Sequence, residues 1–194
     1  MGLAILVLGL VVFLGCHVFT TLRGERAALV ARLGESTYKI LYSIVSVVGI
    51  ALIAWGFAEY RANEWVNVWY PPVWTRHLAA LLVWPAMIML VAAYARGNIY
   101  RKLKHPMLAG VKLWALAHLL ANGDLGSIVL FGSILAWAVY DRISLKRRTD
   151  PGAPPIPVGG MHQDIIAVVG GSVLYVLLAT VFHRYVIGVP VFGA

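Results

Sequence analysis

The sequence predicts an all-α fold, a polytopic membrane bundle of about six transmembrane helices, and composition is the first reason. Of its 194 residues, 61% are hydrophobic and only 12% are charged, with a mean hydropathy of +0.82. Soluble domains carry about 45–50% apolar and about 25% charged residues, so this chain is too apolar to be one. The second reason is that its apolar runs have the length, roughly 17–25 residues, that a helix needs to cross a bilayer. We therefore expect a single integral membrane domain over residues 1–194.

Each expected span has its own apolar run. In chain order the spans are Gly2–Leu22, Ile40–Ala58, Trp74–Ala95, Pro106–Ala121, Leu125–Tyr140 and Ile165–Ile187. Gly49 and Gly56 lie on one face of the second span, which permits close helix packing. Pro85 should kink the third span. The fourth and fifth spans are short and meet at the turn signal Asn122–Asp124, so they should form an antiparallel hairpin.

Most of the 16 lysines and arginines lie in alternate loops. They are Arg23, Arg26, Arg32, Lys39, Arg96, Arg101, Lys102, Lys104, Arg142, Lys146, Arg147 and Arg148. This alternation is the positive-inside pattern, and it predicts three cytoplasmic loops with both termini outside. The +8 net charge therefore orients the chain in the lipid bilayer, and we expect no nucleic-acid partner. The last basic loop, about 142–163, contains the Pro/Gly-rich stretch TDPGAPPIPVGG, which predicts a solvated cytoplasmic linker.

Two of the six histidines, His17 and His118, lie deep in apolar runs. A polar ring at bilayer depth needs a partner to offset its desolvation, so both are candidate site residues. The single cysteine, Cys16, excludes an intrachain disulfide and a thiolate metal cluster. Haem held between imidazoles of two helices is a common arrangement in bundles, and we expect His17 and His118 to ligate a haem iron. The alternative is that each ring bonds a neighbouring helix in a structural membrane protein without cofactor.

The expected depths of the histidines in the membrane do not decide whether His17 or His77 pairs with His118. At about 1.5 Å of rise per residue, His17 lies roughly 8–9 Å from the cytoplasmic end of its helix at Arg23. His118 lies roughly 18–20 Å from the start of its own helix. Helix tilt, or a deeper helix start near Lys112, would bring the two rings to one depth. Otherwise His77, at the outer start of the third span, is the partner of His118.

The remaining candidates lie nearer the membrane surfaces. His105, at the cytoplasmic mouth of the fourth span, caps the helix, contacts lipid headgroups or contributes to the cofactor site. Lys112 is either a lysine that snorkels to the interface or a partner for a haem propionate. We expect His162, in the last basic loop, to be solvated, and His183, near the outer end of the last span, to be structural.

Several segments resemble the NnrU family. They are LGCHVFTTLRGERAALVARLGESTYKILYSIVS (Leu14–Ser46), PPVWTRHL (Pro71–Leu78), HPMLAGVKLWALAHLLANGD (His105–Asp124), FGSILAWAVYDRISLKRR (Phe131–Arg148) and FHRYVIGVPV (Phe182–Val191). NnrU proteins are bacterial membrane proteins associated with nitrite and nitric oxide metabolism in denitrifiers. The resemblance therefore implies a place in the bacterial inner membrane and a role in nitrogen-oxide chemistry.

A narrower part of the chain is similar to the plastid 15-cis-zeta-carotene isomerases, which are haem b membrane enzymes with histidine ligands. The shared features are a histidine in the first helix, matched by His17, and a HPxxxGxxxWxxAH stretch, which begins at His105 and ends at His118. This resemblance implies haem b as cofactor and a lipophilic polyene as an alternative substrate. The chain departs at Ala115, where the plant enzymes carry a cysteine, so a thiolate ligand exchange has no counterpart here.

The HPxxxG element also resembles the RHPxYxG stretch of membrane isoprenylcysteine and phospholipid methyltransferases. Lys104 stands here in place of the arginine, and the paired-glutamate motif does not follow, since the last glutamate is Glu64. We therefore expect no methyltransferase activity.

These observations together predict an NnrU-family membrane protein that binds haem b. Two histidine ligands leave a six-coordinate iron without an open position, which favours electron transfer to a redox partner, or redox sensing, in nitrogen-oxide metabolism. A haem-dependent cis–trans isomerase of a carotenoid-like polyene is the enzyme alternative. A structural membrane protein without cofactor is the other.

Overall fold

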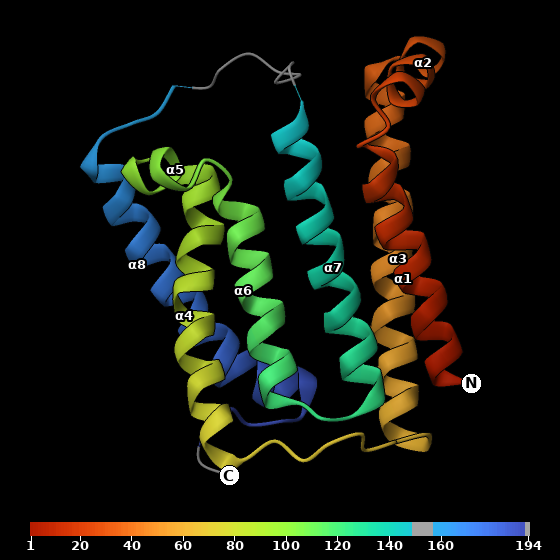
Figure 1. Cartoon of the computed structure of the whole chain (residues 1–194), viewed down its shortest axis with the longest axis vertical. Coiled ribbons are helices and arrows are strands. Elements are labelled where there is room, and N and C mark those ends of the chain that lie inside the picture. Colours follow the sequence, from red (N-terminus) through yellow and green to blue (C-terminus); the bar gives the residue numbers. More distant parts are fainter. Residues whose placement is uncertain (149–156, 193–194) are drawn as a thin grey trace. The chain divides into compact units, whose positions relative to one another are not determined.

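A computed structural model describes residues 1–148 and 157–192, and in these residues every regular element is a helix. In chain order (Figure 1) they are α1 (Gly2–Phe19), α2 (Arg23–Leu33), α3 (Glu35–Asn63), α4 (Val73–Ala95), α5 (Asn98–Leu103), α6 (Pro106–Ala121), α7 (Leu125–Arg147), α8 (Met161–Leu177) and the π-helix η1 (Leu178–Ile187). Five of the described helices are long and apolar enough to cross a membrane: α1, α3, α4, α7 and α8 continued by η1. The shorter apolar helix α6 corresponds to the fourth expected span. The predicted all-α membrane fold is confirmed.

The structure adds two helices that hydropathy did not predict. Helix α2 occupies the first basic loop, where its alanines, leucines, arginines and glutamate are good helix formers. Helix α5 is a six-residue helix in the third loop. Helix α7 runs to Arg147, beyond the end expected for the fifth span, and α8 begins at Met161. Of the predicted Pro/Gly-rich linker, residues 149–156 lie outside the described residues.

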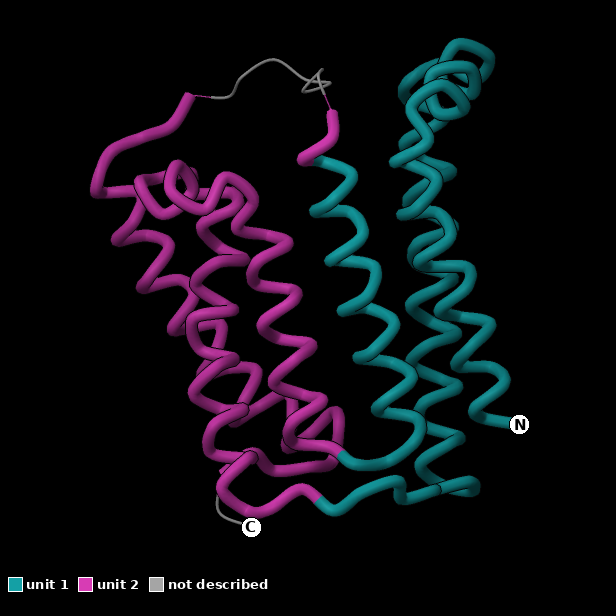
Figure 2. Tube along the Cα trace, in the orientation of Figure 1, with its two compact units in different colours: residues 1–70, 123–145 teal, residues 71–122, 146–194 magenta. Residues whose placement is uncertain are grey.

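The chain divides into two compact units (Figure 2). Unit 1 comprises residues 1–70 and 123–145, and unit 2 comprises residues 71–122 and 146–194. The short connection Asn122–Asp124 leads from α6 in unit 2 to α7 in unit 1. The hairpin expected there joins two different units and stays a prediction.

Glycines let α1 and α3 pack with their backbones in contact in unit 1. A Cβ added at Gly56 would overlap the backbone of Leu6, and one at Gly49 would overlap that of Phe13. On the opposing helix, a Cβ at Gly9 would overlap the backbone of Ile53. The close packing predicted from Gly49 and Gly56 is confirmed, because both glycines face α1.

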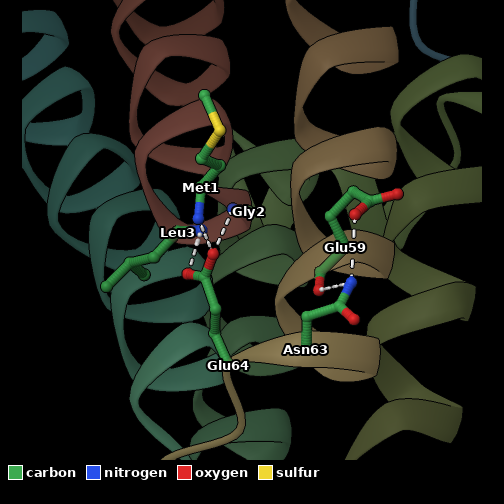
Figure 3. Close-up of polar contacts among 6 residues, drawn as sticks. All are labelled: Met1, Gly2, Leu3, Glu59, Asn63 and Glu64. Carbon is green, nitrogen blue, oxygen red and sulfur yellow. Dashed lines mark hydrogen bonds and ion pairs between the residues drawn. The ribbon is translucent and has the colours of Figure 1, made fainter.

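A carboxylate fixes the start of α1 against the end of α3 (Figure 3). Glu64, which directly follows α3, accepts hydrogen bonds from the backbone N–H of Gly2 at 2.7 Å and of Leu3 at 3.1 Å. The same carboxylate forms an ion pair with the amine of Met1. An anion at this position satisfies N–H groups that have no partner within the helix and complements the helix dipole.

The segment after Glu64 holds the start of α7 in unit 1. The backbone N–H of Val68 donates to the carbonyl of Gly123 at 2.8 Å, and that of Leu125 donates to the carbonyl of Val66 at 2.9 Å. The buried Asp124 accepts a hydrogen bond from the backbone N–H of Ser127 at 2.9 Å and so caps α7. Asp124 thus serves the turn predicted at this position.

In unit 2, α4 packs against both α6 and α8. A Cβ added at Gly110 of α6 would lie 2.8 Å from the carbonyl oxygen of Ala86, and one at Gly171 of α8 would overlap the backbone of Ile88. The Trp84 indole donates to the Ser172 hydroxyl at 2.9 Å. Helix α4 continues through Pro85, and the kink expected there stays a prediction.

Candidate cofactor site

The His17 imidazole is held by a carbonyl of its own helix. Its Nδ1 lies 2.7 Å from the carbonyl oxygen of Phe13, one turn earlier in α1. Because a carbonyl oxygen only accepts, this contact assigns the ring proton to Nδ1 and the lone pair to Nε2. A neutral imidazole with this tautomer presents Nε2 as a metal ligand.

Aromatic rings from three helices surround His17 in unit 1. The ring centroids of Phe13, Tyr42 and Trp137 lie 4.3, 5.4 and 5.3 Å from that of His17, and Trp137 meets it edge-on. The thiol of Cys16 lies 3.4 Å from the His17 Nδ1 and 3.3 Å from the Ser46 hydroxyl. His17 is therefore half-buried in an aromatic cage rather than exposed to lipid.

Two buried donors near His17 have no hydrogen-bond partner among the described residues. They are the indole N–H of Trp137 and the hydroxyl of Tyr38, whose ring stacks on that of Tyr42. A buried donor without a partner costs about 1–3 kcal/mol, so such groups are rare and call for an explanation. A bound group with acceptor atoms would satisfy them.

The His118 imidazole is held in the same way in unit 2. Its Nδ1 lies 2.8 Å from the carbonyl oxygen of Trp114, again one turn earlier, so Nε2 carries the lone pair. The Trp114 ring lies 4.8 Å from the His118 ring. Across from it, His183 of η1 places its ring centroid 6.1 Å from that of His118, with the two planes 32° apart.

The other predicted site residues lie at different places in unit 2. His77 is exposed in the first turns of α4. His105 is the N-cap residue of α6, as expected, although its side chain forms no capping hydrogen bond. Lys112 is half-buried within α6. His162 is exposed, in agreement with the expected solvation, and lies 3.0 Å from the Gln163 amide.

The structure brings His118 together with His183, which the sequence predicts to be structural. His17 belongs to unit 1 and His118 to unit 2, so the pairing of these two stays a prediction. The rival pairing of His77 with His118, both of which belong to unit 2, also stays a prediction. A sequence signal for His183 exists only in the FHRY segment that resembles the NnrU family, because its proximity to His118 depends on tertiary packing.

The available donors suit a haem iron better than a bare metal ion. Within the described residues, no group of three or more His, Cys, Asp or Glu side chains lies close enough to hold a metal ion. A bare Zn²⁺ ion needs three or four protein ligands, whereas a haem iron needs only one or two, because the porphyrin supplies the rest. Imidazoles with Nδ1–H bonded to a carbonyl and Nε2 as ligand therefore fit haem.

The fold and these histidines define the class of protein, a helical membrane protein with half-buried imidazoles on its apolar helices. The family follows from a direct comparison: residues 5–191 match the family model described as NnrU protein, so the chain belongs to the NnrU family. The resemblance seen in the sequence is confirmed over nearly the whole chain. Searches of curated proteins and of solved structures gave no match.

Proposed function

We propose that this NnrU-family protein binds haem b in the bacterial inner membrane, with His118 and His17 as iron ligands. We further propose that it acts in nitrite and nitric oxide metabolism, by electron transfer or redox sensing. The observation that supports haem is the shared hydrogen bond of both imidazoles to the carbonyl one turn earlier. Ligating histidines usually donate their second ring N–H to such an acceptor. Family membership supports the metabolic role.

When bound, the haem supplies an iron that cycles between two oxidation states. The protein's own groups orient the ligands and set their basicity. The carbonyls of Phe13 and Trp114 keep the proton on Nδ1 and aim Nε2 away from the helix backbone. The unpartnered donors of Trp137 and Tyr38 suit acceptor groups of the cofactor, such as propionates. Axial donors from the protein and their hydrogen bonds tune the potential of the iron.

Absorption and electron paramagnetic resonance spectra of the purified protein, oxidised and reduced, test the proposal. Wild-type protein should show a low-spin haem b spectrum. His118→Ala should lose the haem, and His17→Ala should shift the low-spin signal or convert it to high-spin. His162→Ala, an exposed histidine, is the control and should change nothing.

Three results would contradict the proposal or redirect it. Wild-type protein without haem after haem-supplemented expression would refute it. Loss of the low-spin signal in His77→Ala, with the His17→Ala spectrum unchanged, would instead place the haem site near His77, toward the periplasmic side. Turnover of an added carotenoid-like polyene would assign the isomerase function instead.

We also propose that both termini face the periplasm. The support is the concentration of basic residues in α2, α5 and the end of α7, which follow alternate apolar helices. A periplasm-dependent reporter fused after Ala194 should be active, while the same reporter inserted after Lys102 of α5 should be inactive. Activity of a cytoplasm-dependent reporter at Ala194 instead would refute the six-span assignment.

A further inference from the structure

We propose that His183 is an axial ligand donor that faces His118, so that unit 2 alone carries two imidazoles for one haem iron. The proposal rests on the proposed function in taking the metal to be haem iron. It goes beyond it in adding a third histidine, one that resides on the same compact unit as His118.

The distance between the two rings is the first support. Two imidazoles that bind one metal through bonds of about 2.0–2.1 Å have centroids roughly 5 Å apart at a tetrahedral angle and roughly 6.3 Å apart when opposite each other. The observed separation of His118 and His183 is 6.1 Å, close to the opposed arrangement. Axial ligands of a haem are opposed in this way.

The local structure around His183 is the second support. The residue lies in η1, a π-helix that continues α8 and ends at Gly188, which has a left-handed φ of 75°. π-Helical turns are rare, and many of those known occur at functional sites. The flanking side chains Phe182 and Tyr185 are 43% and 74% exposed, whereas His183 is half-buried. The backbone N–H of Val189 donates to the carbonyl of His183 at 2.9 Å and fixes this end of the helix.

The number of donors identifies the kind of metal centre. His118 and His183 form a pair, and within the described residues no third His, Cys, Asp or Glu completes a cluster with them. Two protein ligands are too few for a tight bare-metal site but fill both axial positions of a haem. With His17, the proposed site then has three imidazoles for two axial positions, and His183 holds the position opposite His118 when His17 is absent.

Spectra of haem-loaded full-length protein test this ligand. His17→Ala should stay low-spin with a shifted signal, and the double variant His17→Ala/His183→Ala should be high-spin. His17→Ala/His77→Ala is the matched control and should behave as His17→Ala alone. Conversion of His183→Ala alone to high-spin would also support the proposal and would make His183 the resident ligand. The proposal is wrong if His17→Ala is already as high-spin as the double variant while His183→Ala retains the wild-type spectrum.

A gain of signal protects the test against variants that fail to fold. In the His17→Ala background, His183→Met should give the near-infrared charge-transfer band of a His/Met haem. Absence of this band from a variant that retains haem would count against ligation by residue 183.

Copper binding tests whether the His118 and His183 rings can bind one metal ion in the absence of haem. It therefore separates this proposal from the proposed function. In haem-free protein carrying His17→Ala, His77→Ala and His162→Ala, bound Cu²⁺ should show hyperfine coupling to two imidazole nitrogens. Adding either His118→Ala or His183→Ala should leave coupling to one. If the wild-type protein carries no haem but the copper variant still shows coupling to two nitrogens, the haem proposal is refuted. The pairing of His118 with His183 is then retained. Coupling to a single nitrogen, or no Cu²⁺ binding, would refute the pair.

Discussion

His17 in unit 1 and His118 in unit 2 are held by the same local device, but their surroundings differ. Each imidazole bonds through Nδ1 to the carbonyl of an aromatic residue one turn earlier. The His17 ring then meets rings of Phe13, Tyr42 and Trp137, whereas the His118 ring meets Trp114 and a second imidazole, that of His183. The helix therefore sets the tautomer, and tertiary packing decides what the free side of the ring meets.

This difference separates two tasks that a buried histidine can have. An imidazole in an aromatic cage gains packing contacts on its faces and needs a partner only for its second nitrogen. In unit 2 the His118 ring lies beside a second imidazole at a centroid distance of 6.1 Å, and the metal shared by these two rings is our proposal. In unit 1, by contrast, two buried donors, the Trp137 indole N–H and the Tyr38 hydroxyl, have no hydrogen-bond partner among the described residues.

The largest expected effect comes from disrupting the contact between α1 and α3, two of the helices whose aromatic rings surround His17. Gly56→Val should unfold unit 1, because the new side chain would overlap the backbone of Leu6 and overpacking costs about 1–3 kcal/mol or more. Gly132→Val in α7 is the matched control, since a Cβ there meets nothing within 4 Å. Thermal unfolding in detergent measures the difference. Equal stability of the two variants would show that α1 and α3 do not pack through Gly56.

Much of this architecture could be predicted from the sequence, because hydropathy and glycine spacing are local signals. Helix α6 has the predicted bounds Pro106–Ala121, and α4 differs from its prediction by one residue. Helix α5 could not be predicted, since it depends on a distant residue: the Asp164 carboxylate accepts hydrogen bonds from the Ile99 N–H at 2.8 Å and the Asn98 amide at 2.7 Å.

The site could be predicted only in part. Apolar surroundings singled out His17 and His118, and helix geometry alone accounts for their bonds to Phe13 and Trp114. The position of His183 depends on a π-helix and on how α8 packs against α4, neither of which leaves a periodic signal in the sequence. The sequence therefore predicts only a structural histidine at the helix end.

A smaller effect should follow from removing one donor beside His17. Trp137→Phe keeps the edge-on ring and deletes the indole N–H that has no partner in the described part of the chain. If that N–H binds a cofactor acceptor, the variant should hold haem about ten- to a hundredfold more weakly, since a hydrogen bond to a charged group contributes about 1.5–3 kcal/mol. Haem transfer to apomyoglobin measures the change.

The outcome of this substitution has a clear alternative. Without an acceptor, loss of a buried unpartnered donor should leave haem retention unchanged and raise the melting temperature. Such a result would make the His17 cage a packing element and leave unit 2 as the candidate haem site.

The smallest expected effect compares one hydrogen bond from each unit. In unit 1 the Tyr60 hydroxyl, fully buried, accepts from the Val66 N–H at 3.1 Å and so ties the segment before α4 to α3. In unit 2 the Trp84 indole donates to the Ser172 hydroxyl at 2.9 Å. Hydrogen bonds within membrane proteins average about 0.6 kcal/mol, so Trp84→Phe should cost that little. Tyr60→Phe should cost more, about 1–3 kcal/mol, because it removes both hydrogen bonds between the Tyr60 hydroxyl and the Val66 backbone. Unfolding in a denaturing detergent resolves the two, and a larger loss for Trp84→Phe would show that the α4–α8 hydrogen bond contributes more to stability than the bonds between Tyr60 and Val66.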